Sequence, residues 1–117
     1  MCHSFAIELN HIILTDQFGI LEQELAHYTR AIGHPARVAV LLAIAKKGNL
    51  VEGDVIDVPP LSKATVIQHL RELKRAGLID GRIFGVKSKY WIDKDNFEKF
   101  KKDFSNFSSQ INIDVTP

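Results

Sequence analysis

The stretch LSKATVIQHLRELKRAGLI, residues 61–79, decides the fold of this chain. Its apolar residues recur at steps of four and three, the spacing of one buried stripe on an α-helix. These residues are Val66, Leu70 and Leu73. Ser62 suits the N-cap, because its hydroxyl accepts a free amide hydrogen of the first turn. Gly77 predicts the end of the helix, against which Leu78 is expected to pack. We therefore expect a helix over residues 62–76.

The residues that follow this helix predict a β-hairpin. Isoleucine, valine and aromatic residues are frequent in residues 79–84 and 88–92, which favours two short strands. Gly85 suits the turn between them, because glycine adopts positive φ values at little cost. We therefore expect residues 85–87 to form the tip of the hairpin.

A further helix is predicted over residues 35–47. Pro35 suits its first position, where the missing amide hydrogen costs little, and His34 is expected to cap or precede it. Gly48 predicts its end. Its segment VAVLLAIA is apolar throughout, so we expect this helix to form the centre of the core. The predicted inward face comprises Val38, Leu41, Leu42 and Ala45.

Residues 50–58 lie between these two helices and are ambiguous. We favour a short helix around residues 52–57. Pro59 and Pro60 would end it, because neither donates a backbone hydrogen bond. Residues 52–76 would then form a helix-turn-helix in which the short helix supports the longer one.

Amphipathic helices are expected on both sides of this motif. The first covers residues 15–32 and begins at Thr15 or Asp16, and the last covers residues 95–108 and is capped by Asp95 or Asn96. The apolar stripe of the first helix comprises Ile20 or Leu21, Leu25, Tyr28 and Ile32, and that of the last comprises Phe97, Phe100, Phe104 and Phe107. Residues 5–14 fit either a strand or a helix, and the tail from residue 108 is expected to fray.

The order of these elements predicts a winged helix-turn-helix that is mostly α-helical with a small β-hairpin, the wing, over residues 79–92. A length of 117 residues with 45% hydrophobic content fits one globular domain over residues 1–117. Cys2 is the single cysteine, which excludes an intrachain disulfide and a multi-thiolate metal site. We expect a cytoplasmic protein without a signal peptide or membrane span.

The net charge of +1 hides an uneven distribution. Residues 1–61 carry four basic and seven acidic residues, a net charge of −3. Residues 62–90 carry seven basic and two acidic residues, a net charge of +5, and residues 91–117 carry a net charge of −1. The helix predicted over residues 62–76, which we call the recognition helix, and the wing therefore hold the positive charge. This placement suits binding to a phosphate backbone, and the alternative is that an exposed helix and hairpin carry lysines for solubility.

Polar side chains at the start and on the outer face of the predicted recognition helix suit DNA. Gln68 fits an adenine edge in the major groove, and Ser62 and Thr65 fit phosphates near the positive helix end. The candidates for reading or positioning are Ser62, Lys63, Thr65, Gln68 and His69, and those for holding phosphates are Arg71, Arg82, Lys87 and Lys89.

Three segments together resemble the ArsR type, the arsenical-resistance repressor family of winged helix-turn-helix regulators. They are AIGHPARVAVLLAI (31–44), LSKATVIQHLRELKRAGLI (61–79) and GRIFGVKSKYWI (81–92). The resemblance implies a homodimer formed by the first and last long helices, bound to double-stranded DNA at an imperfect palindrome. The residues expected at the dimer interface are Leu25, Tyr28, Phe97, Phe100 and Phe104.

The chain departs from this family at its usual metal sites. Many relatives carry a cysteine pair after the central helix, where this chain has Leu50-Val51-Glu52-Gly53, and others use Asp and His on the last helix, where no histidine follows His69. Cys2, His3 and His11 are a poor metal site near a chain end. We therefore expect no metal and no cofactor.

No phosphate-binding glycine loop, catalytic triad or carboxylate pair stands out, so we expect no enzyme. The sequence predicts a DNA-binding transcriptional regulator, most simply a repressor. One alternative is a winged-helix protein-interaction module, which an exposed Ile67 would favour. In a DNA-binding protein, Ile67 would instead contact a thymine methyl group or pack on the supporting helix. A second alternative adds an organic or metallic inducer between the dimer helices.

Overall fold

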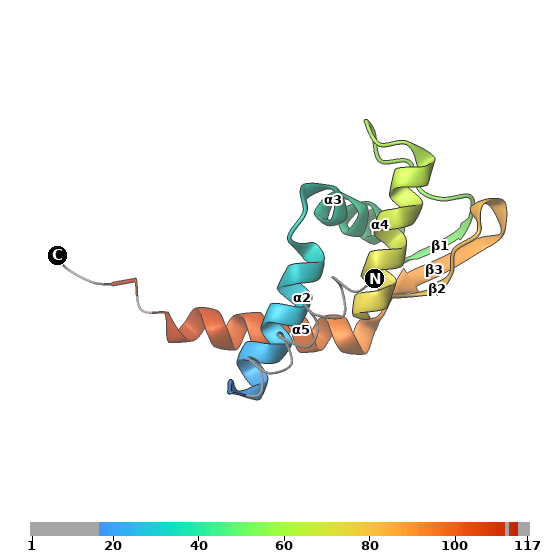
Figure 1. Cartoon of the computed structure of the whole chain (residues 1–117). Coiled ribbons are helices and arrows are strands. Elements are labelled where there is room, and N and C mark those ends of the chain that lie inside the picture. Colours follow the sequence, from blue (N-terminus) through green and yellow to red (C-terminus); the bar gives the residue numbers. More distant parts are fainter. Residues whose placement is uncertain (1–16, 112, 115–117) are drawn as a thin grey trace, which may run out of the picture.

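The computed structural model describes residues 17–111 and 113–114 and has the predicted mixture of helices and a small sheet (Figure 1). Its helices are α2 (Ile20–Ile32), α3 (Pro35–Lys46), α4 (Lys63–Ala76) and α5 (Lys94–Gln110). Its strands are β1 (Leu50–Gly53), β2 (Ile79–Arg82) and β3 (Ser88–Ile92), and the 3₁₀ turn η1 (Gly85–Lys87) joins β2 to β3. The three strands form one antiparallel sheet in the order β1-β3-β2.

Helix α4 forms as its sequence predicts. The Ser62 hydroxyl accepts the amide hydrogen of Thr65 at 3.3 Å and caps the helix. Gly77 ends it with φ at 89°, and the Leu78 amide donates to the Leu73 carbonyl at 3.1 Å. The stripe of Val66, Leu70 and Leu73 is buried, as is Leu78.

The prediction of a short helix around residues 52–57 is wrong. Strand β1 takes up the first of these residues, and an irregular segment over residues 54–62 leads into α4. Gly53 turns the chain with φ at 95°, and the Asp54 carboxylate accepts the amide hydrogen of Val55 at 2.8 Å, which competes with helical bonding. The amide of Ile56 donates to the buried Tyr90 hydroxyl at 3.0 Å. This segment is therefore joined to β3 and adds Val55, Ile56 and Val58 to the core without being a helix.

Helix α3 contributes to the core but is exposed along one side, so the expectation that it forms the centre of the core is wrong, and its buried face differs from the predicted one. Ala36, Val40 and Ile44 point into the core. Of the predicted inward residues, Val38 and Leu42 are 42% and 59% exposed, Ala45 is exposed, and Leu41 alone is half-buried. Because the helix is apolar on every side, its periodicity does not identify the face that α2, α4 and the sheet cover.

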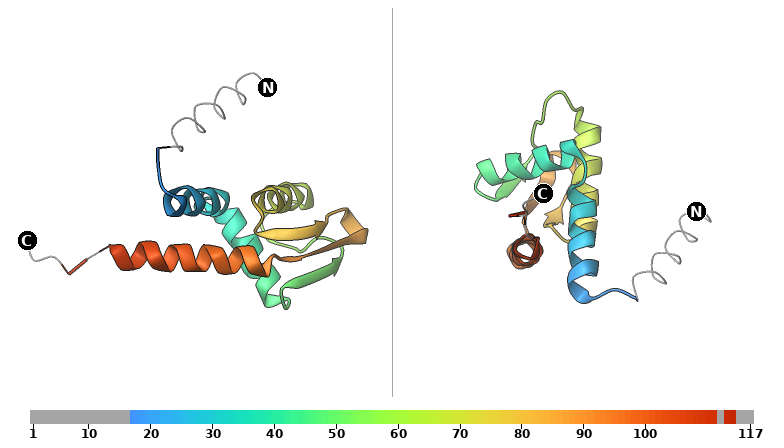
Figure 2. Two further views of the ribbon diagram at one scale, coloured as in Figure 1. Left: turned by 90° about the horizontal axis from the view of Figure 1, so that it is seen from below. Right: turned by 90° about the vertical axis from the view of Figure 1, so that its left-hand side faces the viewer.

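The first and last described helices begin at other residues than predicted. Asp93 caps α5, because its carboxylate accepts the amide hydrogen of Asn96 at 3.0 Å, so Asp95 and Asn96 are not the cap. Helix α2 begins at Ile20 after Gly19, and the predicted starts Thr15 and Asp16, like residues 5–14 and Cys2, lie outside the described residues. Helices α2 and α5 cross on the side of the molecule away from the hairpin tip (Figures 1 and 2).

Candidate nucleic-acid interface

The outer face of α4 presents the polar side chains that the sequence singled out. Ser62, Lys63, Gln68 and Arg71 are exposed. Thr65 is half-buried, and its hydroxyl lies 2.9 Å from that of Ser62, so the two hydroxyls share a hydrogen bond at the helix start. This end of the helix carries partial positive charge from its free amide groups, which favours an anion such as phosphate.

His69 does not lie on that face, so its assignment to DNA or solvent is wrong. The side chain is 9% exposed, and its Nδ1 accepts a hydrogen bond from Arg37 Nε at 3.3 Å. Burial lowers the pKa of His69, and the neighbouring His34 and Arg37 lower it further. Arg37 also donates to the Ala31 carbonyl at 3.2 Å. His69 therefore fixes α4 against α2 and α3 instead of contacting a ligand.

The prediction that His34 begins α3 is confirmed. Its Nδ1 accepts the amide hydrogen of Ala36 at 3.0 Å, and its ring lies 4.8 Å from that of His69. Further along α4, His27 Nε2 lies 2.8 Å from the Ala76 carbonyl oxygen and joins α2 to the end of α4. Histidines from the preceding elements thus contact α4 at its middle and at its end.

Helical spacing adds two residues that the sequence interpretation missed. Arg75 lies four residues after Arg71 and seven after Gln68, so these side chains share one face. Arg75 is exposed and pairs with Glu72 at 2.9 Å. Ala64, four residues before Gln68, is also exposed and lets the helix approach a surface closely. The spacing from Gln68 would have identified both residues.

The sheet register places basic residues opposite one another on the exposed face of the wing. Arg82 is paired with Lys89 across β2 and β3, and Glu52 of β1 lies on the other side of Lys89. Like charges directly opposite each other destabilise a sheet. The Glu52 carboxylate, 3.5 Å from Lys89 Nζ, offsets part of this repulsion. Such an arrangement is explained if the basic pair serves an anionic partner.

A second acidic residue restrains the start of α4. The Asp54 carboxylate forms an ion pair and hydrogen bond with Lys63 Nζ. This bond, together with the one from Val55, holds the pKa of Asp54 below its usual range and raises that of Lys63. Lys63 and Lys89 are therefore both paired with acidic side chains, from β1 and the segment after it.

The wing is attached closely to α4. A Cβ atom at Gly81 would lie 2.2 Å from the Lys89 carbonyl oxygen, and its φ is 127°, so only glycine fits this approach of β2 to β3. Lys74 of α4 donates to the Gly81 carbonyl through its ammonium group. This contact joins the end of α4 to β2 of the wing.

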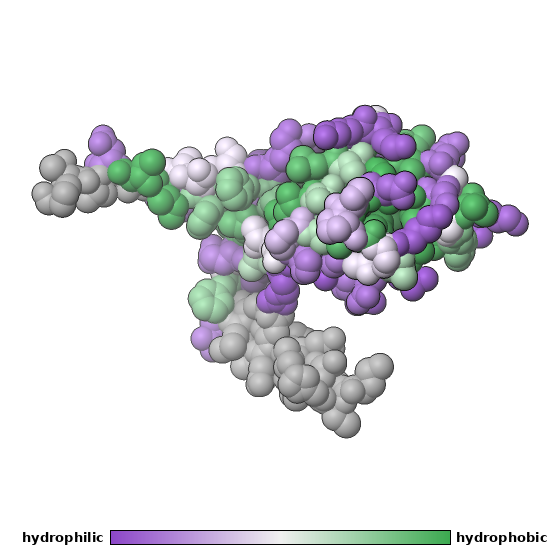
Figure 3. Space-filling view, turned by 90° about the horizontal axis from the view of Figure 1, so that it is seen from above, coloured by the Kyte–Doolittle hydropathy of each residue, from purple (hydrophilic) through white to green (hydrophobic). Residues whose placement is uncertain are grey.

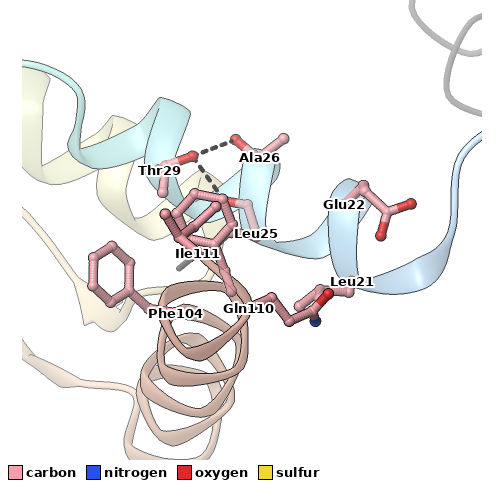
Figure 4. Close-up of a pocket in the computed structure, with 9 residues that line it drawn as sticks. Leu21, Glu22, Leu25, Ala26, Thr29, Phe104, Gln110 and Ile111 are labelled. Carbon is pink, nitrogen blue, oxygen red and sulfur yellow. Dashed lines mark hydrogen bonds between the residues drawn. The ribbon is translucent and has the colours of Figure 1, made fainter. Parts of the chain in front are cut away.

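A second surface, an apolar groove of about 570 Å³, lies between α2 and α5 (Figure 4). Of the predicted interface residues, Leu25 and Phe104 line it. Tyr28 and Phe100 are instead buried inside this chain, with ring centres 5.7 Å apart, and Phe97 packs beside Phe100. The crossing of α2 and α5 thus covers Tyr28 and Phe100 within one chain, which contradicts their assignment to an interface, whereas Phe97 is half-buried and its interface role stays a prediction. The groove also takes side chains from Leu21, Phe107 and Ile111.

Two further features bear on rival functions. Ile67 is half-buried and packs against the core, so it is not the exposed contact that a protein-interaction module would need. Among residues 17–111 and 113–114, no group of three or more His, Cys, Asp or Glu side chains lies close enough to hold a metal ion, and Cys2, His3 and His11 lie outside that part. No described helix is both long and apolar enough to cross a membrane.

Comparisons with known proteins agree with this geometry. The model of the bacterial regulatory protein ArsR family matches residues 34–80, from the cap of α3 into β2. An uncharacterized HTH-type transcriptional regulator of Methanocaldococcus jannaschii is 29% identical over 80 residues, which are 68% of this chain and 90% of that protein.

A comparison of the fold with solved structures also finds a regulator of this type. An ArsR-like transcriptional regulator from Rhodococcus sp. RHA1 superposes with a TM-score of 0.51 at 17% identity, over 76% of this chain and 83% of that one. At this identity the likeness concerns the fold, which is the predicted winged helix-turn-helix. Over residues 34–80 the chain is thus similar in sequence to the bacterial ArsR family of regulators, and its fold is the winged helix-turn-helix of an ArsR-like regulator.

Proposed function

We propose that this chain is a cytoplasmic, homodimeric repressor that binds an imperfectly palindromic operator through α4 and the wing. The observation that carries the proposal is the pairing of Arg82 with Lys89 on the exposed face of the sheet, in a chain whose α4 also exposes polar and basic side chains. Phosphates on the DNA backbone would offset the repulsion between these two positive side chains. Their contact would also release counterions, which favours binding.

The polar residues of α4 and the wing divide between two tasks. Gln68, exposed in the middle of the helix, suits bidentate pairing with adenine in the major groove. Ser62, Thr65 and Lys63 suit phosphates at the helix start, while Arg71, Arg82, Lys87 and Lys89 suit phosphates along the flanks. The exposed Arg75 extends this set toward the end of α4.

The homodimer is proposed from the groove between α2 and α5. Phe104, Phe107 and Ile111 line this groove and are 50%, 44% and 53% exposed. A contiguous apolar surface of this kind on a small protein marks an interaction site. A second copy would cover it and place two α4 helices one DNA turn apart, about 34–36 Å.

Selection of bound duplexes from a random DNA pool tests this function. We expect enrichment of one imperfect palindrome whose half-sites are about 10 base pairs apart from centre to centre. Gln68→Ala should relax the sequence preference at one base pair, whereas binding of the other positions should persist. A pool without enrichment, and binding that does not weaken with added salt, would contradict a DNA-binding role.

The groove also favours one extension of this function, an organic inducer that binds between the dimer helices. Its lining is mostly apolar, with Thr29, Glu22 and Gln110 as polar groups, which is the composition of a small-molecule site. Thermal-shift screening of metabolites and metal ions tests this extension. A stabilising metabolite that also releases DNA would support it, and no stabilising compound in either set would favour a regulator without an inducer.

A further inference from the structure

Helix α3 has two apolar faces, of which the core covers only one. The second is the face that the periodicity predicts to be buried, and Val38 and Leu42 on it are exposed. Apolar side chains one helical turn apart are neighbours on the helix surface, so the two form a continuous apolar surface. Figure 3 shows the molecule from above, the side on which α3 lies in Figure 1, with exposed hydrophobic side chains bordered by hydrophilic ones. This second face is available to a partner outside the core.

A pocket of about 450 Å³ lies beside this face, between α3 and the first half of α5. Its apolar walls come from both helices and from the end of β3. They comprise Leu41, Leu42, Ala45, Ile92 and Phe97. The pocket shares no lining residue with the groove between α2 and α5. Its volume and its mostly apolar lining are those of a site for a small organic molecule.

Backbone hydrogen bonds fix the positions of the pocket walls. The Ile92 amide donates to the Asn49 carbonyl at 3.1 Å, which joins the end of β3 to the turn after α3. The Asp93 amide donates to the Leu78 carbonyl at 3.0 Å, and the Asp93 carboxylate caps α5. The walls therefore need little rearrangement to accept a ligand, which lowers the entropic cost of binding.

The polar groups of the pocket favour an anion. They are Asn49, Lys94, Glu98 and Lys101. Glu98 forms an ion pair with Lys101 at 3.6 Å, so these two charges offset each other. Lys94 is exposed and forms no ion pair within the described part of the chain. It begins α5, where the free backbone amides add positive charge.

This combination of walls and charge selects one kind of ligand. A neutral hydrocarbon would cover the apolar walls but leave Lys94 without a partner. A small inorganic anion would pair with Lys94 but leave the walls in water. A molecule with an apolar body and one carboxylate satisfies both, because its two parts match the two parts of the lining.

We propose that the pocket between α3 and α5 binds a small organic acid, whose hydrocarbon body packs on Leu42 and Phe97 and whose carboxylate pairs with Lys94. The site is separate from the groove between α2 and α5 that is proposed for the dimer and an inducer. The inference goes beyond the proposed function, because binding of the acid does not require DNA.

Calorimetric titration of the full chain with octanoate, without DNA and below the micelle concentration, tests the proposal. Octanoate should bind, and 1-octanol, which has the same hydrocarbon chain without the charge, should bind at least about tenfold more weakly. Lys94→Gln should weaken octanoate binding about tenfold and leave that of 1-octanol unchanged. The matched control is Lys102→Gln, which removes an exposed lysine of α5 that does not line the pocket.

Three further variants locate the ligand. Leu42→Glu places a carboxylate at an exposed position of the apolar wall and should weaken octanoate binding more than tenfold. Val38→Glu adds the same charge to α3 outside the pocket and should retain octanoate binding. Phe104→Glu/Phe107→Glu changes only the groove between α2 and α5 and should also retain it.

Each opposite result would overturn the proposal. Absence of octanoate binding, or equal binding of octanoate and 1-octanol, would mean that the pocket is not a site for an acid. Loss of binding in the double phenylalanine variant would place the ligand in the groove between α2 and α5. A change of oligomeric state on Leu42→Glu, measured by sedimentation, would show that a second copy of the chain covers this face. A chain that binds octanoate in this pocket but binds no DNA would contradict the proposed function and leave this inference intact.

Discussion

The surface formed by α4 and the wing and the groove between α2 and α5 differ in the interaction that each offers. The first carries exposed basic and amide side chains over a buried apolar stripe, and the second exposes leucine, phenylalanine and isoleucine. Electrostatic contacts depend on salt and are suited to a polyanion, whereas apolar burial suits a complementary protein surface. The difference agrees with the proposed division, in which the first surface binds DNA and the second binds another copy of the chain.

The largest effect is expected from charge placed in the groove. Phe104→Glu/Phe107→Glu adds two carboxylates at half-exposed positions of α5, so the fold should persist while a dimer would have to bury unpaired charge. Affinity for the palindrome should fall by about 100-fold or more, because the two half-sites are no longer bound together. Sedimentation and gel-shift measurements check both results.

Asn106→Glu is the matched control for that change. It adds a carboxylate on the same helix, but Asn106 does not line the groove. It should leave the oligomeric state and the affinity close to those of the unmodified chain. A double phenylalanine variant that remains dimeric would place the interface elsewhere.

The next largest effect concerns the cations of the wing. Lys87→Ala/Lys89→Ala should weaken binding to all duplexes about tenfold at moderate salt and lower the slope of log K against log salt by about 0.9 for each lost phosphate contact. Lys46→Ala/Lys47→Ala removes the same charge at the end of α3 and should change the slope little. Equal slopes in the two double variants would mean that the wing does not contact phosphates.

A smaller change of opposite sign is expected from the acidic residues beside the interface. Glu52→Gln and Asp54→Asn release Lys89 and Lys63 from their ion pairs, and each should raise DNA affinity about two- to fivefold, as expected for exposed pairs. Asp95→Asn on α5 is a control with the same loss of charge. If it raises affinity equally, the effect is one of net charge and not of these pairs.

The smallest effect is on stability and concerns the attachment of α4. Because burial lowers the pKa of His69, protonation favours the unfolded state, where the pKa is about 6.5. Stability should therefore be full above that value and fall as the pH decreases through it. Glu72 opposes this effect, and His34 and Arg37 add to it.

Thermal unfolding between about pH 7.5 and 5.5, around the reference pKa of histidine, measures this dependence. The profile of His69→Gln should be shallower than that of the unmodified chain, because the glutamine does not titrate. His27→Gln, which keeps His69, should retain the steeper profile. Parallel profiles for all three chains would show that His69 does not contribute to the pH dependence.

Local patterns were sufficient for α4 and the hairpin. Each has one buried side, a cap and a turn residue within a few positions, so periodicity and the Ser62 and Gly77 signals define it. The same reasoning failed for α3, which is apolar all round, and for residues 52–57, where the pairing of β1 with β3 and the contact of Ile56 with Tyr90 are made over 34 residues or more. Long-range pairs of this kind leave no periodic signal.

The candidate site shows the same division. Exposure of Gln68 and Arg71 followed from helical spacing, but spacing could not show that His69 turns toward Arg37 or that Tyr28 meets Phe100. Those contacts depend on how α2, α3 and α5 pack around α4. An amphipathic stripe indicates which side of a helix is buried, but it does not identify the element that packs against that side.

By itself, the sequence determined α4, the hairpin and the concentration of positive charge on both. These features depend on residues that are close together in the chain. Only the tertiary structure decided which aromatic residues of α2 and α5 remain exposed and which basic residues have acidic neighbours. It also decided that an irregular segment joined to β3 precedes α4. These features arise where distant segments meet, and their energies are set by burial and by distance between charges.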